Sequence, residues 1–191
     1  MRSFLPYLLV LAVAAVPTAA DAFDGNRKGF VLAMGMGAGS VSLDRTVGGE
    51  GADETAGAFI IESRIGRGFT DRFLLYFDES ALLSSESAVE HSEFGLGFSA
   101  YFSEDPQSLY TLGLVGFTTY DSNGIPAHTG PGVSGGMGWQ FARHWSAEGT
   151  IHWGSADRQE VRSGLINLQE PGPALERRSL TLRVVLCGAL Y

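Results

Sequence analysis

Short stretches with strict alternation of apolar and polar residues run along most of this chain. Phe94, Leu96 and Phe98 would lie on one face of an extended strand, whereas Glu93 and the intervening glycines would lie on the other. Similar stretches recur up to the C-terminus and are separated by turn-forming residues. A period of two over several residues is typical of β-strands, so the pattern predicts an all-β chain.

Eight strands are predicted from this alternation. They span residues 29–43, 58–68, 73–83, 91–102, 109–120, 132–141, 145–155 and 178–190. In each strand one face is apolar and the other mixes glycine with polar or charged residues. In the fifth strand we place Tyr110, Leu112 and Leu114 on the apolar, outward face.

The polar faces carry a set of ionisable residues that would meet inside a closed barrel. These are Glu62, Arg64, Asp78, His91, Glu93, Glu148, His152 and Arg183. Isolated buried charges are costly, so we expect a paired interior network in which Arg64 and Arg183 sit among Glu62, Glu93 and Glu148.

The N-terminus has the features of a secretory signal peptide over residues 1–22. Arg2 precedes a short apolar run, Leu5 to Val16, and Ala20-Asp21-Ala22 fits an A-x-A cleavage site. A membrane helix is the less favoured alternative, because spanning takes ~20 apolar residues. The mature protein is then expected to be a single domain, residues 23–191.

The connections between the predicted strands alternate in length. Short ones are expected at 70–72, 103–108 and 142–144, and mostly longer, more polar ones at 44–57, 84–90, 121–131 and 156–177. In an up-and-down barrel every second connection lies at the same end, and outer-membrane barrels have short periplasmic turns and longer external loops.

Aromatic residues cluster near the expected short turns and, to a lesser extent, near the opposite ends of the strands. Such residues favour the interface between lipid and water. The first set comprises Phe69, Phe73, Phe102, Tyr110, Phe141 and Trp145, and the second comprises Phe59, Tyr120 and Trp153.

Composition excludes several functions. The net charge of -8 argues against nucleic-acid binding, which needs a basic surface. The single cysteine, Cys187, allows neither an intramolecular disulfide nor a cysteine-based metal site. We expect no cofactor and no metal, and no nucleotide-binding or zinc-protease motif is present.

With a signal peptide, eight alternating strands and short inner turns, the chain resembles the small eight-stranded outer-membrane barrels of the OmpA/OmpX type. Tyr191 matches the terminal aromatic residue that the barrel-assembly machinery reads in that family, although it is out of phase with Leu186 and Leu190. The resemblance implies an eight-stranded antiparallel up-and-down transmembrane β-barrel, monomeric, surrounded by lipid and lipopolysaccharide in the outer membrane of a Gram-negative-type cell.

The expected function is non-enzymatic, structural or surface-interacting, because side chains fill the interior of an eight-stranded barrel. A gated water or ion path is one alternative. A second is a lipid A deacylase-like hydrolase using His144, Ser146 and Glu148, although this set would face inward, whereas a lipid-cleaving site should open to the membrane. A third is a soluble periplasmic lipocalin-like barrel, which would have to bury Glu62 and Arg64 in an apolar ligand cavity.

Overall fold

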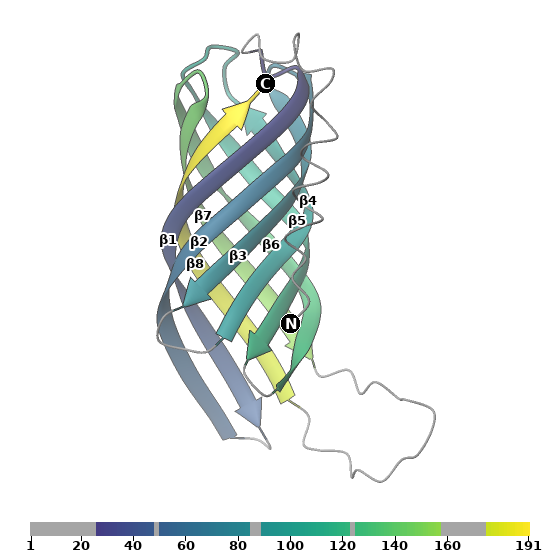
Figure 1. Cartoon of the computed structure of the whole chain (residues 1–191), viewed down its shortest axis with the longest axis vertical. Helices are drawn as coiled ribbons and strands as arrows, with labels where there is room; N and C mark the ends of the chain where they lie inside the picture. Colours follow the sequence, from purple (N-terminus) through teal and green to yellow (C-terminus); the bar gives the residue numbers. More distant parts are fainter. Residues whose placement is uncertain (1–25, 48–49, 85–88, 123–124, 158–174) are drawn as a thin grey trace, which may run out of the picture.

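The computed structural model describes residues 26–47, 50–84, 89–122, 125–157 and 175–191. The predicted signal peptide, residues 1–22, lies outside these ranges. Eight strands form one closed antiparallel barrel in which each strand pairs with its neighbours in sequence and β1 pairs with β8 (Figure 1). The strands are β1 (Gly29–Val47), β2 (Glu50–Thr70), β3 (Phe73–Ser84), β4 (Val89–Tyr101), β5 (Ser108–Ser122), β6 (Ile125–Ala142), β7 (Trp145–Asp157) and β8 (Leu175–Leu190). The predicted fold class is confirmed.

The two ends of the barrel differ. The turns at 71–72 and 143–144 and the C-terminus lie at one end, which we call the turn end. At the opposite end, the arm end, the hairpin of β1 and β2 reaches beyond the last β2–β3 pair, Ala58 with Ser84, while β1 stays paired with β8 (Figure 1). No helix among the described residues has the length and apolar character needed to cross a membrane.

Two of the connections predicted to be long are largely strand. The β1–β2 ladder continues without interruption to Val47 opposite Glu50, and β6 already begins at Ile125. The expected loops at 44–57 and 121–131 were therefore wrong over most of their length. Backbone pairing needs no apolar side chain, so polar segments extend the hairpins beyond the region where alternation marks a strand.

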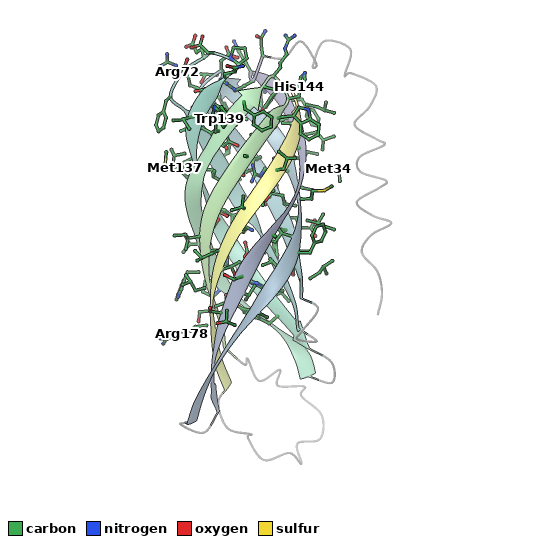
Figure 2. All side chains as sticks on the ribbon, turned by 90° about the vertical axis from the view of Figure 1, so that its left-hand side faces the viewer. Met34, Arg72, Met137, Trp139, His144 and Arg178 are labelled. Carbon is green, nitrogen blue, oxygen red and sulfur yellow. The ribbon has the colours of Figure 1, made fainter. Side chains whose placement is uncertain are left out.

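Side-chain polarity is inverted relative to a water-soluble barrel. Leu96, Trp139 and Ile151 are 51%, 53% and 55% exposed on the outside. In contrast, Glu93 and Glu148 are 1% and 3% exposed, because they point inward. Figure 2 shows the outer face from Arg72 at the turn end through the apolar middle of the barrel to Arg178 nearer the arm end.

The phase predicted for β5 was wrong. Tyr110, Leu112 and Leu114 are buried inside, whereas Val115 and Phe117 are exposed. Both faces of β5 carry apolar residues, so alternation of hydrophobicity does not identify the outward face. Inside, Tyr110 and Leu112 belong to a buried cluster that also includes Tyr76.

The aromatic residues divide between the outer surface and the interior. Most of those predicted to form interfacial girdles are exposed on the outside: Phe59, Phe69, Phe73, Phe102, Trp145 and Trp153. Tyr110 and Tyr120 are corrections, because they are 1% and 0% exposed and point inward. A tyrosine hydroxyl can bond to an interior polar group, which a lipid-facing position does not offer.

Candidate functional site

The charged interior is the most distinctive feature of this barrel. All eight ionisable residues expected there are at most 6% exposed. They come from β2, β3, β4, β7 and β8, so they meet only because the sheet closes on itself. They form a cluster around Arg64 and another around Arg183.

Arg64 on β2 binds three carboxylates. Its Nη1 and Nη2 donate to the two oxygens of Glu148 at 2.7 and 2.6 Å, and its Nε donates to Asp78 Oδ2 at 2.8 Å. Glu62 Oε1 lies 2.9 Å from Nη2. Tyr110 donates to Glu148 Oε1 at 2.5 Å. This Arg64 cluster ties β2 to β7 across the lumen.

Arg183 on β8 holds the second cluster. Its Nη1 lies 2.9 Å from Glu93 Oε2 and donates to Ser80 Oγ at 3.0 Å. Its Nε donates to Thr150 Oγ1 at 2.5 Å. The guanidinium therefore links β8 to β3, β4 and β7. The two arginines divide the acidic residues between them, Arg64 with Glu62 and Glu148, and Arg183 with Glu93.

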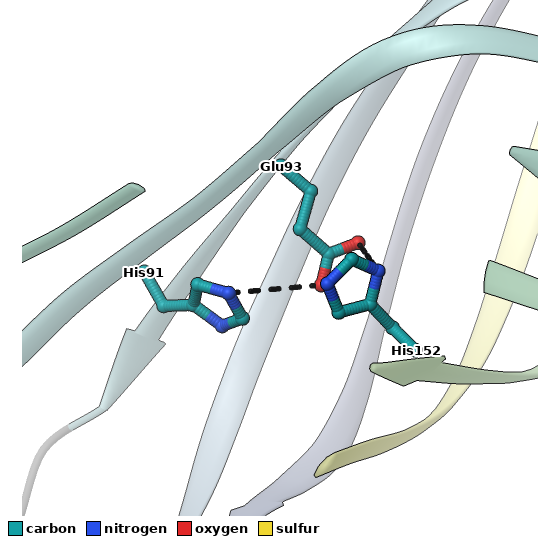
Figure 3. Close-up of side chains that lie close together, drawn as sticks. All are labelled: His91, Glu93 and His152. Carbon is teal, nitrogen blue, oxygen red and sulfur yellow. Dashed lines mark ion pairs between the residues drawn. The ribbon is translucent and has the colours of Figure 1, made fainter. Parts of the chain in front are cut away.

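Two buried histidines meet at Glu93 (Figure 3). They lie farther from the turn end than Arg183, because His152 pairs with Thr181 and Arg183 with Thr150. His152 Nδ1 lies 3.1 Å from Glu93 Oε2, and His91 Nε2 lies 3.9 Å from Glu93 Oε1. The other ring nitrogen of His152, Nε2, is 2.8 Å from Thr118 Oγ1. Alternation predicts that all three residues face inward but does not predict that they meet.

Arg27, which sequence reasoning missed, lies at the turn end. It is 3% exposed, donates to Gln140 Oε1 at 2.9 Å, and lies over the ring of Tyr101 at 3.8 Å. Its Nη atoms donate to the backbone carbonyls of Asp71, Ser103 and Asp105. The residue precedes the first strand, so strand periodicity says nothing of its position.

The alternative catalytic set does not assemble into a triad. Glu148 is held by Arg64 and Tyr110. His144 Nδ1 lies 2.9 Å from the carbonyl oxygen of Ala189. No hydrogen bond joins His144, Ser146 and Glu148, whose side chains are all described. A serine nucleophile needs a histidine within hydrogen-bond reach, and Ser146 has none in this conformation.

An apolar exterior around an ionic interior defines the transmembrane class of up-and-down β-barrels. No protein-family model matches the chain, and no curated protein matches its sequence.

Solved structures with a similar arrangement include Neisserial surface protein A and the outer membrane protein OprG from Pseudomonas aeruginosa. The first is 12% identical, with a TM-score of 0.48, over 84% of this chain and 97% of its own. The second is 11% identical, with a TM-score of 0.48, over 88% and 99%. The N-terminal β-barrel domain of Pseudomonas aeruginosa OprF is 12% identical, with a TM-score of 0.40, over 82% and 98%. Likeness at this level carries no information about ligands or activity.

Proposed function

We propose that this chain is a non-enzymatic, monomeric β-barrel of the outer membrane of a Gram-negative-type cell, with a structural or surface-interaction role. The observation that carries the proposal is the Arg64 cluster, which crosses the lumen of a barrel whose outside is apolar. Such an outside fits acyl chains and lipopolysaccharide, and a crossed lumen fits a barrel that does not conduct.

The plugged interior is supported by contacts at two levels. The bidentate Arg64–Glu148 pair is the strongest kind of ionic contact, because both N–H groups meet both oxygens. Nearer the turn end, Tyr101 stacks on Tyr110 at 4.5 Å and contacts Arg27. Eight strands leave an interior that side chains can fill, so these contacts leave little room for a solute.

The orientation follows from the difference between the two ends. We place the turn end in the periplasm and the arm end outside the cell, because outer-membrane barrels have short inner turns. The β1–β2 hairpin and the arm-end residues of β7 and β8 then face the exterior and are the surfaces available for a partner. Folding would depend on the barrel-assembly machinery.

Envelope fractionation, gel mobility and conductance test this proposal together. We expect the protein in the outer-membrane fraction, and we expect the folded barrel to change mobility on boiling. In planar lipid bilayers the purified barrel should give no steady conductance. Recovery in the soluble periplasmic fraction would contradict the membrane location, and stable channels would contradict the plugged interior.

Hydrolysis of lipid A is tested separately. The substitution Ser146→Ala should leave the lipid A mass profile of the producing cells unchanged, because Ser146 has no histidine partner in the structure. The control is an empty-vector strain, which shows whether the wild-type protein alters the profile at all. A wild-type-dependent loss of acyl chains that disappears in Ser146→Ala would overturn the non-enzymatic proposal.

A further inference from the structure

We propose that His91, Glu93 and His152 bind one divalent first-row transition-metal ion, of which Zn²⁺ is the probe, inside the barrel toward the arm end. The expectation from sequence was that no metal binds, because cysteine ligands are lacking. A second group, Glu62, Glu148 and Cys187, is also compact, but Arg64 already contacts both of its carboxylates.

The donor atoms are close enough to share an ion. One ligand atom from each of His91, Glu93 and His152 can be chosen so that all lie within 4.8 Å of one another. Donors around tetrahedral Zn²⁺ are separated by about 3.4 Å, so a small inward movement of the side chains suffices. Two imidazoles and one carboxylate suit zinc and its neighbours better than magnesium or calcium, and they leave one position open.

His91 is buried without hydrogen-bond partners, and a bound ion would give its ring a partner. The residue is 3% exposed, and neither ring nitrogen has a hydrogen-bond partner. Its Nε2 points toward Glu93 Oε1 across 3.9 Å, too far for a hydrogen bond (Figure 3). Buried polar atoms are nearly always paired. An ion between these two atoms would satisfy both, while the ring stays stacked on Tyr120 at 4.7 Å.

His152 is oriented as metal-binding histidines usually are. Its Nε2 lies 2.8 Å from Thr118 Oγ1, and its Nδ1 faces the Glu93 carboxylate. If Nε2 carries the proton and donates it to Thr118, the Nδ1 lone pair points at a negative group. A cation between them removes that repulsion, and a hydrogen bond from the second ring nitrogen is the common way of fixing a ligand tautomer.

The surrounding backbone leaves space for this arrangement. A Cβ atom on Gly132 would lie 2.4 Å from Thr118 Oγ1 and 2.8 Å from His152 Cε1. A Cβ atom on Gly154 would lie 2.6 Å from the same hydroxyl oxygen. Two inward-facing glycines on neighbouring strands therefore make room for the Thr118–His152 pair.

Arg183 is the positive charge nearest to the proposed ion. It contacts Glu93 through Oε2 at 2.9 Å, and Oε1 has no hydrogen-bond partner and remains available. Glu93 can therefore bridge the guanidinium and the metal. Repulsion between the two cations lowers the affinity relative to a site with an unshared carboxylate. A water molecule or a small anion from the lumen would complete the coordination.

Metal binding by the refolded barrel in detergent micelles tests the site directly. Titration with Zn²⁺ against a chromophoric chelator should give one ion per wild-type barrel. His91→Asn and His152→Asn should each weaken binding by more than tenfold, and Thr118→Val by about tenfold. His144→Asn is the matched control, because His144 lies at the turn end, and it should bind as the wild type does.

Folding must be separated from binding. Each variant is checked for the change of gel mobility on boiling, and only folded barrels are compared. If the histidine variants do not fold, nitrogen NMR of the wild-type imidazoles replaces them, with Zn²⁺ expected to shift His91 and His152 but not His144. Absence of stoichiometric binding by the folded wild type, equal binding by folded His91→Asn and His152→Asn, or unshifted resonances would overturn the site. None of these results bears on membrane location or conductance.

Discussion

Arg64 is the residue whose substitution should lower the unfolding free energy of the barrel most. Its guanidinium contacts Glu62, Asp78 and Glu148, all buried. Arg64→Met removes the only arginine among the described side chains that contacts these carboxylates, and breaking a buried ion pair costs about 3–5 kcal/mol. We expect a loss of that size in the unfolding free energy, measured by urea titration of the barrel in lipid vesicles with tryptophan fluorescence.

An exposed ion pair supplies the control for that experiment. Arg72 and Glu104 are 3.3 Å apart at the turn end, with side chains 57% and 67% exposed. Such pairs contribute about 0–1 kcal/mol, so Arg72→Ala should have little effect. If Arg64→Met were as stable as Arg72→Ala, the interior charges would not hold the barrel together.

Glu79 is a charged residue on the otherwise apolar outer face of β3. It is exposed between the outward-facing Phe77 and Ala81 and has no ion-pair partner among the described side chains. A carboxylate facing lipid destabilises a barrel by less than the ~2–4 kcal/mol of a basic residue. Glu79→Leu should therefore raise the unfolding free energy in vesicles by about 1 kcal/mol. Glu104→Leu serves as the control, because Glu104 lies at the turn end, outside the apolar outer face. A loss of stability in Glu79→Leu would contradict a lipid-facing position.

At the scale of the strand, alternation predicts a face only where the two faces differ. On β7, Ile151 and Trp153 alternate with Glu148 and His152, and their exposure follows the prediction. On β5 both faces are apolar, so the phase was misassigned. Strand ends were also misjudged, because ladder hydrogen bonds continue through polar residues.

Contacts between strands could not be predicted from periodicity. Arg64 and Glu148 are separated by 84 residues, and His91 and Glu93 meet His152 from another strand. Their inward direction follows from the pleat. Their height along the barrel depends on the stagger between strands, which the sequence pattern does not contain. Hence a paired network of the interior charges was expected, whereas the choice of carboxylates by each arginine and the histidine cluster were not.

The packing of β5 against β6 depends on Gly138, which has no side chain. A Cβ atom on Gly138 would lie 2.2 Å from Tyr110 Cζ. The tyrosine ring is 1% exposed and bonded to Glu148, so it has little freedom to move. Gly138→Ala should lower the unfolding free energy by about 1–3 kcal/mol in the same urea titration, because overpacking strains a filled interior.

Gly149 is the matched control on the neighbouring strand. It is exposed, and a Cβ atom there would meet nothing within 4 Å. Gly149→Ala should therefore leave stability unchanged or slightly improved. Equal effects of the two substitutions would mean that Tyr110 does not occupy the space above Gly138.

For the whole molecule, the decisive property is which face meets the surroundings. Ile151 is 55% exposed near the middle of β7. Ile151→Arg should lower the unfolding free energy in lipid vesicles by about 2–4 kcal/mol, because arginine is costly at the bilayer midplane. The same urea titration measures the change.

Ser155 provides a control on the same strand. It follows Trp153 toward the arm end and shares the outward phase of Ile151. Ser155→Arg should change stability by about 0–1 kcal/mol, as expected near the interface. A water-soluble barrel would tolerate both substitutions equally, so equal effects, or folding of Ile151→Arg without lipid or detergent, would contradict the transmembrane orientation.

The position of Arg27 constrains the order in which contacts form as this chain folds. Its guanidinium donates hydrogen bonds to backbone carbonyls of two separate turns and to the side-chain amide oxygen of Gln140 on β6. These groups come from residues 71 to 140. They are far apart in the sequence and converge only in the folded barrel, although Arg27 itself precedes the first strand. The Arg27 contacts can therefore form only after the strands that carry these groups have come together at the turn end.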